Sequence, residues 1–340
     1  MELERLTLEE WGDALPKTGF EVFHTPEALS VMDDHADADL QLYGGFKGQQ
    51  AVALVPLFVR RPAFGPKVVL SPPPSLGVPY LGPILMPVSP KQKKQERLNQ
   101  KFTDAILDEI GMEESRTVFR IMGSPGYDDP RPFIWSDMES TPSFTYRVDL
   151  DGKSMDDLVS QFNKSLRYEM RKGQDLDITI ERGDLDDARR IHRDIAERFE
   201  EQDSDTNLTW PYVRDLVDGL GDRARVYVAR DPDGEYLGGI MVLYSNDTAY
   251  YWQGGAAASY ENVSVNTVLH HRILSDIVED PPFDDVSAYD LVGANTKRLC
   301  SYKAKFGGDL TRYYTVESDD ATTKLAKRAY QWIDKAGLKG

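Results

Sequence analysis

The chain has 340 residues, of which 57 are acidic and 40 are basic, so its formal net charge is −17 at pH 7. This balance argues against a DNA-binding protein, because the phosphate backbone repels an acidic surface. The charge fits either an ordinary solvated surface or life in high salt, where repulsion between carboxylates is screened; we favour a halophilic host. The length predicts two domains, each able to bury a core of its own.

Cysteine and histidine are too sparse to predict a metal site or a tightly bound cofactor. Cys300 is the only cysteine, and the five histidines lack the spacing of metal ligands. The longest apolar run, residues 51–59, is far shorter than the roughly 20 residues that cross a bilayer. The N-terminus has no basic segment followed by an apolar one. We therefore expect a cytoplasmic protein without integral membrane association.

The first half reads as a mixed α/β domain. Thr7 and Thr25 are predicted N-caps of two helices. Residues 62–90 are rich in proline, so strands there are predicted to be short or at a sheet edge. The other predicted elements are a hairpin over 40–61, a helix over 89–110, strands over 117–122 and 144–150, and a loop over 123–135.

The second half is more regular. We place the junction between the halves near residues 145–152. The predicted helices cover 154–172, 184–202, 210–220, 263–278, 298–305 and 322–335. The predicted strands cover 178–181, 225–229, 238–244, 248–253, 286–291 and 311–316. This order of elements resembles that of a GNAT (N-acyltransferase) domain.

A cluster of basic residues stands out on one predicted helix of this acidic chain. Lys164, Arg167 and Arg171 share one helix face because they are three and four residues apart. An ordinary solvated face explains the pattern as well as a phosphate-binding site does. The second interpretation makes Lys164 and Arg167 candidate substrate-binding residues, since guanidinium groups hold phosphates with paired hydrogen bonds.

The segment from Tyr289 to Leu310 combines a strand end, a glycine turn and a short lysine-bearing helix. Acyl transfer to an amine passes through a tetrahedral oxyanion, which a fixed cation stabilises. Lys303, between Tyr302 and Phe306, fits this task, although exposed helix lysines are the plainer interpretation. Asp290 and Asp128 are candidate bases for the acceptor amine, and Asn295 and Lys305 are candidate substrate-binding residues.

Aromatic residues at 250–252 alternate along a predicted strand, so Tyr251 faces the side opposite to its neighbours. Core packing explains most of them, but Tyr251 could line a cleft. Several enzyme classes lack support in the sequence, because the chain has no G-x-S-x-G elbow, no phosphate-binding P-loop and no G-x-G-x-x-G motif.

Several pieces of the chain, taken together, resemble the FemAB family of peptidyl and aminoacyl transferases and its BioF2-like acetyltransferase relatives. They are TYRVDL, the helix with K-x-x-R, YYWQGGA, VNTVLHHRI, YDLVG and SYKAKFGG. The resemblance implies that Tyr302 and Lys303 are the family's catalytic aromatic residue and lysine. It also implies that Tyr212 and Tyr251 lie in the substrate cleft.

The resemblance further implies an α/β (α+β) fold of tandem GNAT-like domains, with mixed, mostly antiparallel sheets flanked by helices. The implied divisions are residues 1–148, residues 149–317, and a C-terminal helix over 318–340 that packs back on the first domain. The implied activity is transfer of an acyl or aminoacyl group from acyl-CoA or aminoacyl-tRNA to the amine of a small molecule or envelope precursor.

Two departures from the family pattern bear on the substrates. The turn over 256–266, where GNAT enzymes hold the coenzyme A pyrophosphate, contains no glycine, which argues against ordinary acetyl-CoA. Leu208 stands near a cleft arginine of some members, which argues against a murein precursor. The alternative function is a non-catalytic GNAT-like protein that binds a nucleotide- or lipid-linked precursor.

Overall fold

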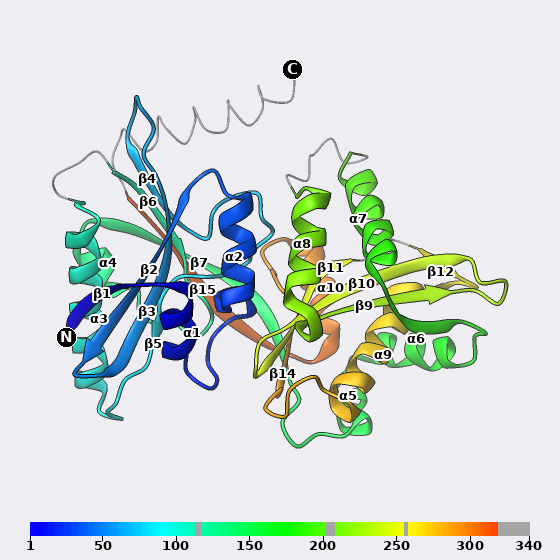
Figure 1. Cartoon of the computed structure of the whole chain (residues 1–340). Coiled ribbons are helices and arrows are strands. Elements are labelled where there is room, and N and C mark those ends of the chain that lie inside the picture. Colours follow the sequence, from blue (N-terminus) through cyan, green and yellow to red (C-terminus); the bar gives the residue numbers. More distant parts are fainter. Residues whose placement is uncertain (113–116, 201–207, 255–257, 319–340) are drawn as a thin grey trace.

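One mixed sheet connects the two halves of the chain in the computed structural model, which describes residues 1–112, 117–200, 208–254 and 258–318. Its thirteen strands within these residues are β1 (Glu2–Leu6), β2 (Asp39–Lys47), β3 (Gln50–Arg60), β4 (Lys67–Ser71), β5 (Ile84–Leu85), β6 (Thr117–Met122), β7 (Met138–Asp149), β8 (Thr179–Gly183), β9 (Ala224–Arg230), β10 (Tyr236–Tyr244), β11 (Thr248–Gly254), β14 (Ala288–Asp290) and β15 (Asp309–Ser318). They follow the order β1-β2-β3-β4-β6-β15-β7-β14-β11-β10-β9-β8, with β5 beside β3 (Figure 1).

The neighbouring strands are antiparallel except for two pairs, β4 with β6 and β11 with β14. Each parallel pair lies on one side of the two long central strands, β15 and β7. β15 pairs along its whole length with β7 and also reaches β6 of the first half. The predicted junction near residue 148 therefore falls at the end of β7, and the sheet is continuous across the two halves.

Helices cover both faces of this sheet (Figure 1). They are α1 (Leu8–Ala14), α2 (Pro26–His35), α3 (Gln92–Glu109), α4 (Arg131–Trp135), α5 (Met155–Gln161), α6 (Lys164–Gln174), α7 (Leu185–Glu200), α8 (Trp210–Leu220), α9 (Val265–Glu279) and α10 (Lys297–Lys303). No helix of the described residues combines the length and the apolar character that a membrane crossing requires.

The two halves share one hydrophobic core on one face of the sheet. Helices α1 and α2 of the first half bury Trp11, Phe23 and Met32 together with Tyr212 and Leu216 of α8. The opposite face carries two separate cores, one beneath α3 and α4 and one beneath α5, α6 and α9. The shared core holds the halves together by burying apolar surface that neither half covers alone.

Local sequence explains where the elements differ from those predicted. The helix expected over 154–172 is two helices, because the side chain of Asn163 caps a new one at the N–H of Leu166. The loop expected over 123–135 contains α4, with Pro132 in its first turn, where proline is tolerated. β4 lies inside the sheet despite the proline-rich surroundings, because its five residues contain none.

Other expectations fall partly outside the described residues. The predicted helix over 322–335 and the 318–340 division beyond Ser318 lie outside them.

The helix expected over 263–278 begins at Val265, because a two-stranded hairpin, β12 (Ser259–Tyr260) and β13 (Val263–Ser264), precedes it.

Candidate active site

The sheet opens where β11 and β14 separate. These parallel strands pair only from Thr248 with Ala288 to Tyr250 with Asp290, after which β11 continues to Gly254 and β14 ends. The side chain of Tyr251 and the loop 291–296 come directly after the last pair. Ligands of open α/β sheets bind at such points, outside the carboxyl ends of strands that diverge.

Lys303 of α10 points its ammonium group into this opening. Its Nζ donates to the carbonyl oxygens of Val292 and Gly293, the latter at 2.8 Å, and lies 5.7 Å from the ring centre of Tyr251. The side chain is buried, and burial lowers the pKa of Lys303 to about 8, against the opposing charge of Asp290. A lysine has three donors, so one N–H stays available beyond the two carbonyls.

The loop that holds Lys303 has an unusual backbone. Val292 has a φ of 49° and Gly293 a φ of 70°, both in the left-handed region. This conformation is strained for a β-branched residue and persists only where the surroundings impose it. Main-chain hydrogen bonds supply part of that support, from the N–H of Leu291 to Tyr146 and from that of Ala294 to Phe144.

Two polar side chains, Asn295 in the loop and Asp290 at the end of β14, also hold the backbone of this loop in place. Asn295 accepts a hydrogen bond from the N–H of Phe144 at 2.8 Å and donates to the hydroxyl of Tyr313 at 3.1 Å. Asp290 accepts from the N–H of Val292 at 2.8 Å and from the hydroxyl of Thr145 at 2.5 Å. These bonds fix the two carbonyls at the positions that Lys303 requires.

The carboxyl group of Asp290 is buried. Burial raises its pKa, and the hydroxyl of Thr145 and the charge of Arg147 act in the opposite direction. Its oxygens already accept hydrogen bonds from the chain, including one to each oxygen from Tyr80 at 3.2 Å. This geometry favours a positioning role over the role of base that the sequence suggested.

Aromatic rings surround Lys303 on its other side. His270 of α9 lies at the centre, with its ring 4.8 Å from Tyr251, 4.9 Å from Phe306 and 6.3 Å from Tyr302. Its Nδ1 bonds the hydroxyl of Tyr289 at 3.0 Å. Burial, with a smaller contribution from the charge of Lys303, lowers the pKa of His270 to about 3, so the imidazole is neutral. Within the described residues, the Nε2 of His270 and the hydroxyl of Tyr302 have no hydrogen-bond partner.

Basic side chains cover the surface beside this site. They lie on α6 and on the segment from α10 to residue 306, and the N–H of Asn163 joins the two by bonding the carbonyl of Lys305. In the part of the chain that the structure describes, no carboxylate forms an ion pair with any of them. We call them the basic surface: Lys164, Arg167, Arg171, Lys172, Lys297, Arg298 and Lys305.

The N-terminus of α9 is occupied by groups of the chain itself. Glu169, the one acidic residue of α6, accepts hydrogen bonds from the N–H of Ser264 at 3.1 Å and the hydroxyl of Thr267 at 3.2 Å. The N–H of Val265 bonds the carbonyl of Ala258. Two N–H groups that could hold a phosphate at this helix start, those of Ser264 and Val265, are thus already used.

The structure brings together most of the residues that the sequence singled out, namely Tyr251, Asp290, Asn295, Tyr302 and Lys303, with Lys164, Arg167 and Lys305 on the adjoining surface. Tyr212 is elsewhere: it is buried in the core shared by the halves, in edge contact with His35 of α2.

Two site residues escaped the sequence analysis. His270 left a signal, because a histidine on an otherwise apolar helix face has to find a partner in the core. Glu169 gave a weaker signal in the sequence, because it is the single acidic residue of a basic helix.

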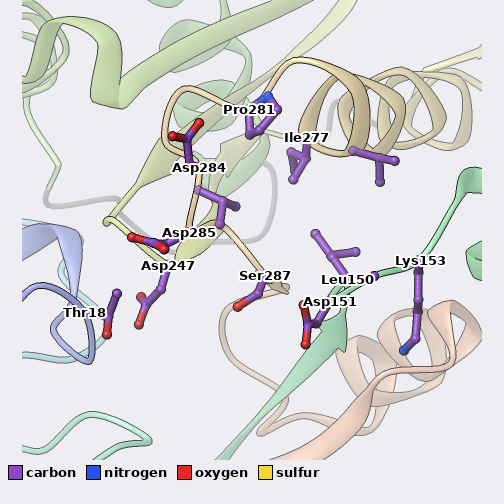
Figure 2. Close-up of a pocket in the computed structure, with 13 residues that line it drawn as sticks. Thr18, Leu150, Asp151, Lys153, Asp247, Ile277, Pro281, Asp284, Asp285 and Ser287 are labelled. Atoms are coloured by element: carbon purple, nitrogen blue, oxygen red, sulfur yellow. The ribbon is translucent and has the colours of Figure 1, made fainter.

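An open pocket of about 590 Å³ is lined by residues outside the Lys303 site (Figure 2). Four aspartates line it, Asp151, Asp247, Asp284 and Asp285, together with Thr18 of the first half. Its carboxylates repel phosphate groups, so a phosphate-bearing substrate has to bind at another surface.

Residues 160–304 match the family model described as acetyltransferase (GNAT) domain, and no curated protein matches the chain. Among solved structures, the chain is similar to FemX, with a TM-score of 0.68 and 13% identity over 92% of this chain and 97% of that one. It is also similar to a domain of a putative lysylphosphatidylglycerol synthetase from Agrobacterium fabrum, with a TM-score of 0.55 and 13% identity over 96% of both chains. L-PGS from Bacillus licheniformis has a TM-score of 0.51 and 13% identity over 91% of this chain and 98% of that one.

The chain therefore contains a GNAT acetyltransferase domain that includes Lys303 and most of its surroundings. As a whole, it has the fold of FemX and of the two synthetase domains. The predicted relationship to FemAB-like GNAT proteins and the predicted α/β fold, with a mostly antiparallel sheet flanked by helices, are confirmed.

Proposed function

We propose that this protein is an aminoacyltransferase that moves an aminoacyl group from a charged tRNA to the amine of a small-molecule or envelope-precursor acceptor. The observation that carries this proposal is the buried ammonium group of Lys303, which two loop carbonyls orient and which, among the described residues, has one N–H without a partner.

The proposed reaction is a direct transfer. The neutral acceptor amine attacks the ester carbonyl, forming a C–N bond and a tetrahedral oxyanion. The free N–H of Lys303 stabilises that oxyanion in a site with little water, where such a donor contributes several kcal/mol. Collapse breaks the C–O bond, and the proton released by the amine goes to the 3′ oxygen of the tRNA. The reaction needs no covalent enzyme intermediate.

The choice of donor follows from where phosphate can bind. The basic surface offers cations beside Lys303, on a chain whose net charge is −17. In contrast, the carboxylate of Glu169 occupies the start of α9, where a coenzyme A pyrophosphate would need free N–H groups. Two structural neighbours are named for lysylphosphatidylglycerol synthesis, one in full and one as L-PGS. The product in that name carries an aminoacyl group, which supports the same class of reaction.

The test is a transfer assay with a pool of labelled aminoacyl-tRNA, and separately with labelled acetyl-CoA. A mixture of amino acids, polyamines and amino sugars serves as acceptor. We expect label to pass from tRNA to an amine with wild-type protein and with Lys91→Met, an exposed lysine of the first half, and turnover to be lost with Lys303→Met. Full activity of Lys303→Met would contradict the catalytic assignment, and transfer only from acetyl-CoA would contradict the donor.

One observation favours the alternative, a binding protein without turnover. Lys303 is only 5% exposed, and the Nε2 of His270 beside it is enclosed. Thermal shift with charged tRNA, coenzyme A and UDP-sugars separates the two functions. Stabilisation by a UDP-sugar without transfer from any donor would support binding; a ligand at 100 times its Kd adds about 2.7 kcal/mol.

A further inference from the structure

One side chain beside Asp290 comes from a distant part of the chain, in the first half. Tyr80 lies between β4 and β5, is 0% exposed, and donates its hydroxyl to both oxygens of Asp290, a residue 210 positions further along. Its ring is fixed by an edge contact with Tyr313 of β15, with ring centres 4.8 Å apart.

The two oxygens of Asp290 have different partners. Oδ1 accepts from Thr145, from the N–H of Val292 and from Tyr80, whereas Oδ2 accepts only from Tyr80 within the described residues. Without that hydroxyl, a buried carboxylate oxygen would have no donor, which is costly in a buried site. The orientation of the carboxylate therefore depends on Tyr80.

Asp290 and Lys303 hold Val292 from its two sides. The N–H of Val292 donates to Asp290, and its carbonyl accepts from the Nζ of Lys303. Because the left-handed conformation of Val292 is strained, a shift of Asp290 would let this residue relax and move the carbonyl that orients Lys303. A continuous series of hydrogen bonds thus runs from Tyr80 to the ammonium group.

We propose that Tyr80 is a positioning residue of the transfer reaction: its hydroxyl fixes Asp290, which fixes the loop that aims Lys303. The expected effect on kcat rests on the proposed function. The expected effect on Lys303 itself rests on geometry alone. The first half thereby takes part in positioning Lys303, because the loop in the second half needs the hydroxyl of Tyr80 to be held in place.

The variant that tests this is Tyr80→Phe, with Tyr127→Phe as a matched control. Tyr127 is also a buried tyrosine of the first half, and its hydroxyl donates to Asn99 at 3.0 Å in the core beneath α3 and α4. We expect Tyr80→Phe to lower kcat about tenfold, equivalent to about 1.4 kcal/mol, with little change in KM for the tRNA. Tyr127→Phe should leave kcat unchanged.

A double variant shows whether Tyr80 acts through Asp290. Asp290→Asn keeps an acceptor for the N–H of Val292, and adding Tyr80→Phe to it should reduce kcat by less than twofold further. Residues that act in one network are non-additive in this way. Independent, multiplying losses would overturn the proposal.

A direct titration separates this inference from the proposed function. Asp290 raises the pKa of Lys303, as does Cys300, while His270 is neutral and Arg147 faces Asp290. Losing the Tyr80 donor disfavours the ionised form of Asp290, so the Lys303 pKa should fall below its wild-type value. NMR of isotope-labelled lysine measures this shift without any turnover. An unchanged Lys303 titration in Tyr80→Phe would overturn the proposal, even if transfer activity were found.

Discussion

The hydroxyl of Tyr250 donates to the buried carboxyl group of Glu21 at 2.5 Å, across the boundary between the two halves. Asp290 is buried nearby, and Arg147 lies close enough for its charge to act on both carboxyl groups. Burial raises the pKa of Glu21 to about 7, and the charges of Asp290 and Asp247 add to this effect, against the charge of Arg147. Glu21 therefore keeps its proton up to about neutral pH.

Glu21→Gln should therefore change the pH dependence of stability. The folded-state pKa of Glu21 is raised from 4.5 to about 7, so wild type binds the proton more tightly when folded and loses stability as pH rises through this window. Between pH 5 and 8 the free energy of unfolding of wild type should fall by about 3 kcal/mol relative to Glu21→Gln. Urea unfolding at both pH values measures it, with exposed Glu235→Gln as control; equal pH dependence of wild type and Glu21→Gln would refute the assignment.

Lys303 should set the alkaline limit of activity. Its pKa is lowered to about 8, so the ammonium group that stabilises the oxyanion is lost above that pH. We expect kcat/KM to fall about tenfold per pH unit above pH 8. Lys303→Arg keeps its charge at these pH values, so its residual activity should lack this decline. A decline that persists in Lys303→Arg would assign it to another group.

The sequence predicts that the central candidate residues lie close together, because they are close in the chain. Asp290, Asn295, Tyr302 and Lys303 lie in one short stretch, where a strand end, a glycine turn and a short helix force them together. Helix caps were equally readable, since Thr7 and Thr25 each form the expected side-chain bond to the helix start. Such features depend on neighbours in the chain and need no knowledge of the sheet.

The long-range partners could not be predicted in this way. Tyr80 meets Asp290 only because β15 enters between β6 and β7, and no local periodicity encodes that strand order. Tyr212 shows the opposite error: a family position suggested a cleft, yet its place beside Val213 and Leu216 on an amphipathic helix indicates the core. The periodicity of the residues themselves was the better guide.

The acidic composition gives a prediction about salt. If the chain comes from a high-salt host, screening of its net charge of −17 should stabilise the fold. The Tm should rise by about 5 °C or more between 0.1 and 2 M KCl, a change of about 3–4 kcal/mol for a chain of this size. Sucrose at equal osmolality controls for solute exclusion. A Tm that is flat or falls with KCl would favour an ordinary solvated surface.

The basic surface should bind tRNA mainly through phosphates. Lys164→Glu and Arg167→Glu should each weaken tRNA binding, and each should reduce the slope of log K against log salt by about 1. Lys91→Glu, an exposed lysine of the first half, is the matched control and should change the slope little. Fluorescence anisotropy with labelled tRNA at several KCl concentrations measures both quantities. Equal losses in all three variants would indicate a general charge effect and no specific surface.

Glu169 gives the last prediction, which concerns the donor that the protein rejects. Its carboxylate satisfies the N–H of Ser264 and the hydroxyl of Thr267, so it takes the position that favours an anion at the start of α9. Wild type should bind neither pyrophosphate nor coenzyme A at millimolar concentrations by calorimetry. Glu169→Gln keeps the size of the side chain and removes its charge, so pyrophosphate binding should become measurable. Exposed Glu261→Gln, in the hairpin before α9, tests whether loss of any nearby negative charge suffices. If wild type and Glu169→Gln bind pyrophosphate equally, Glu169 does not determine the choice of donor.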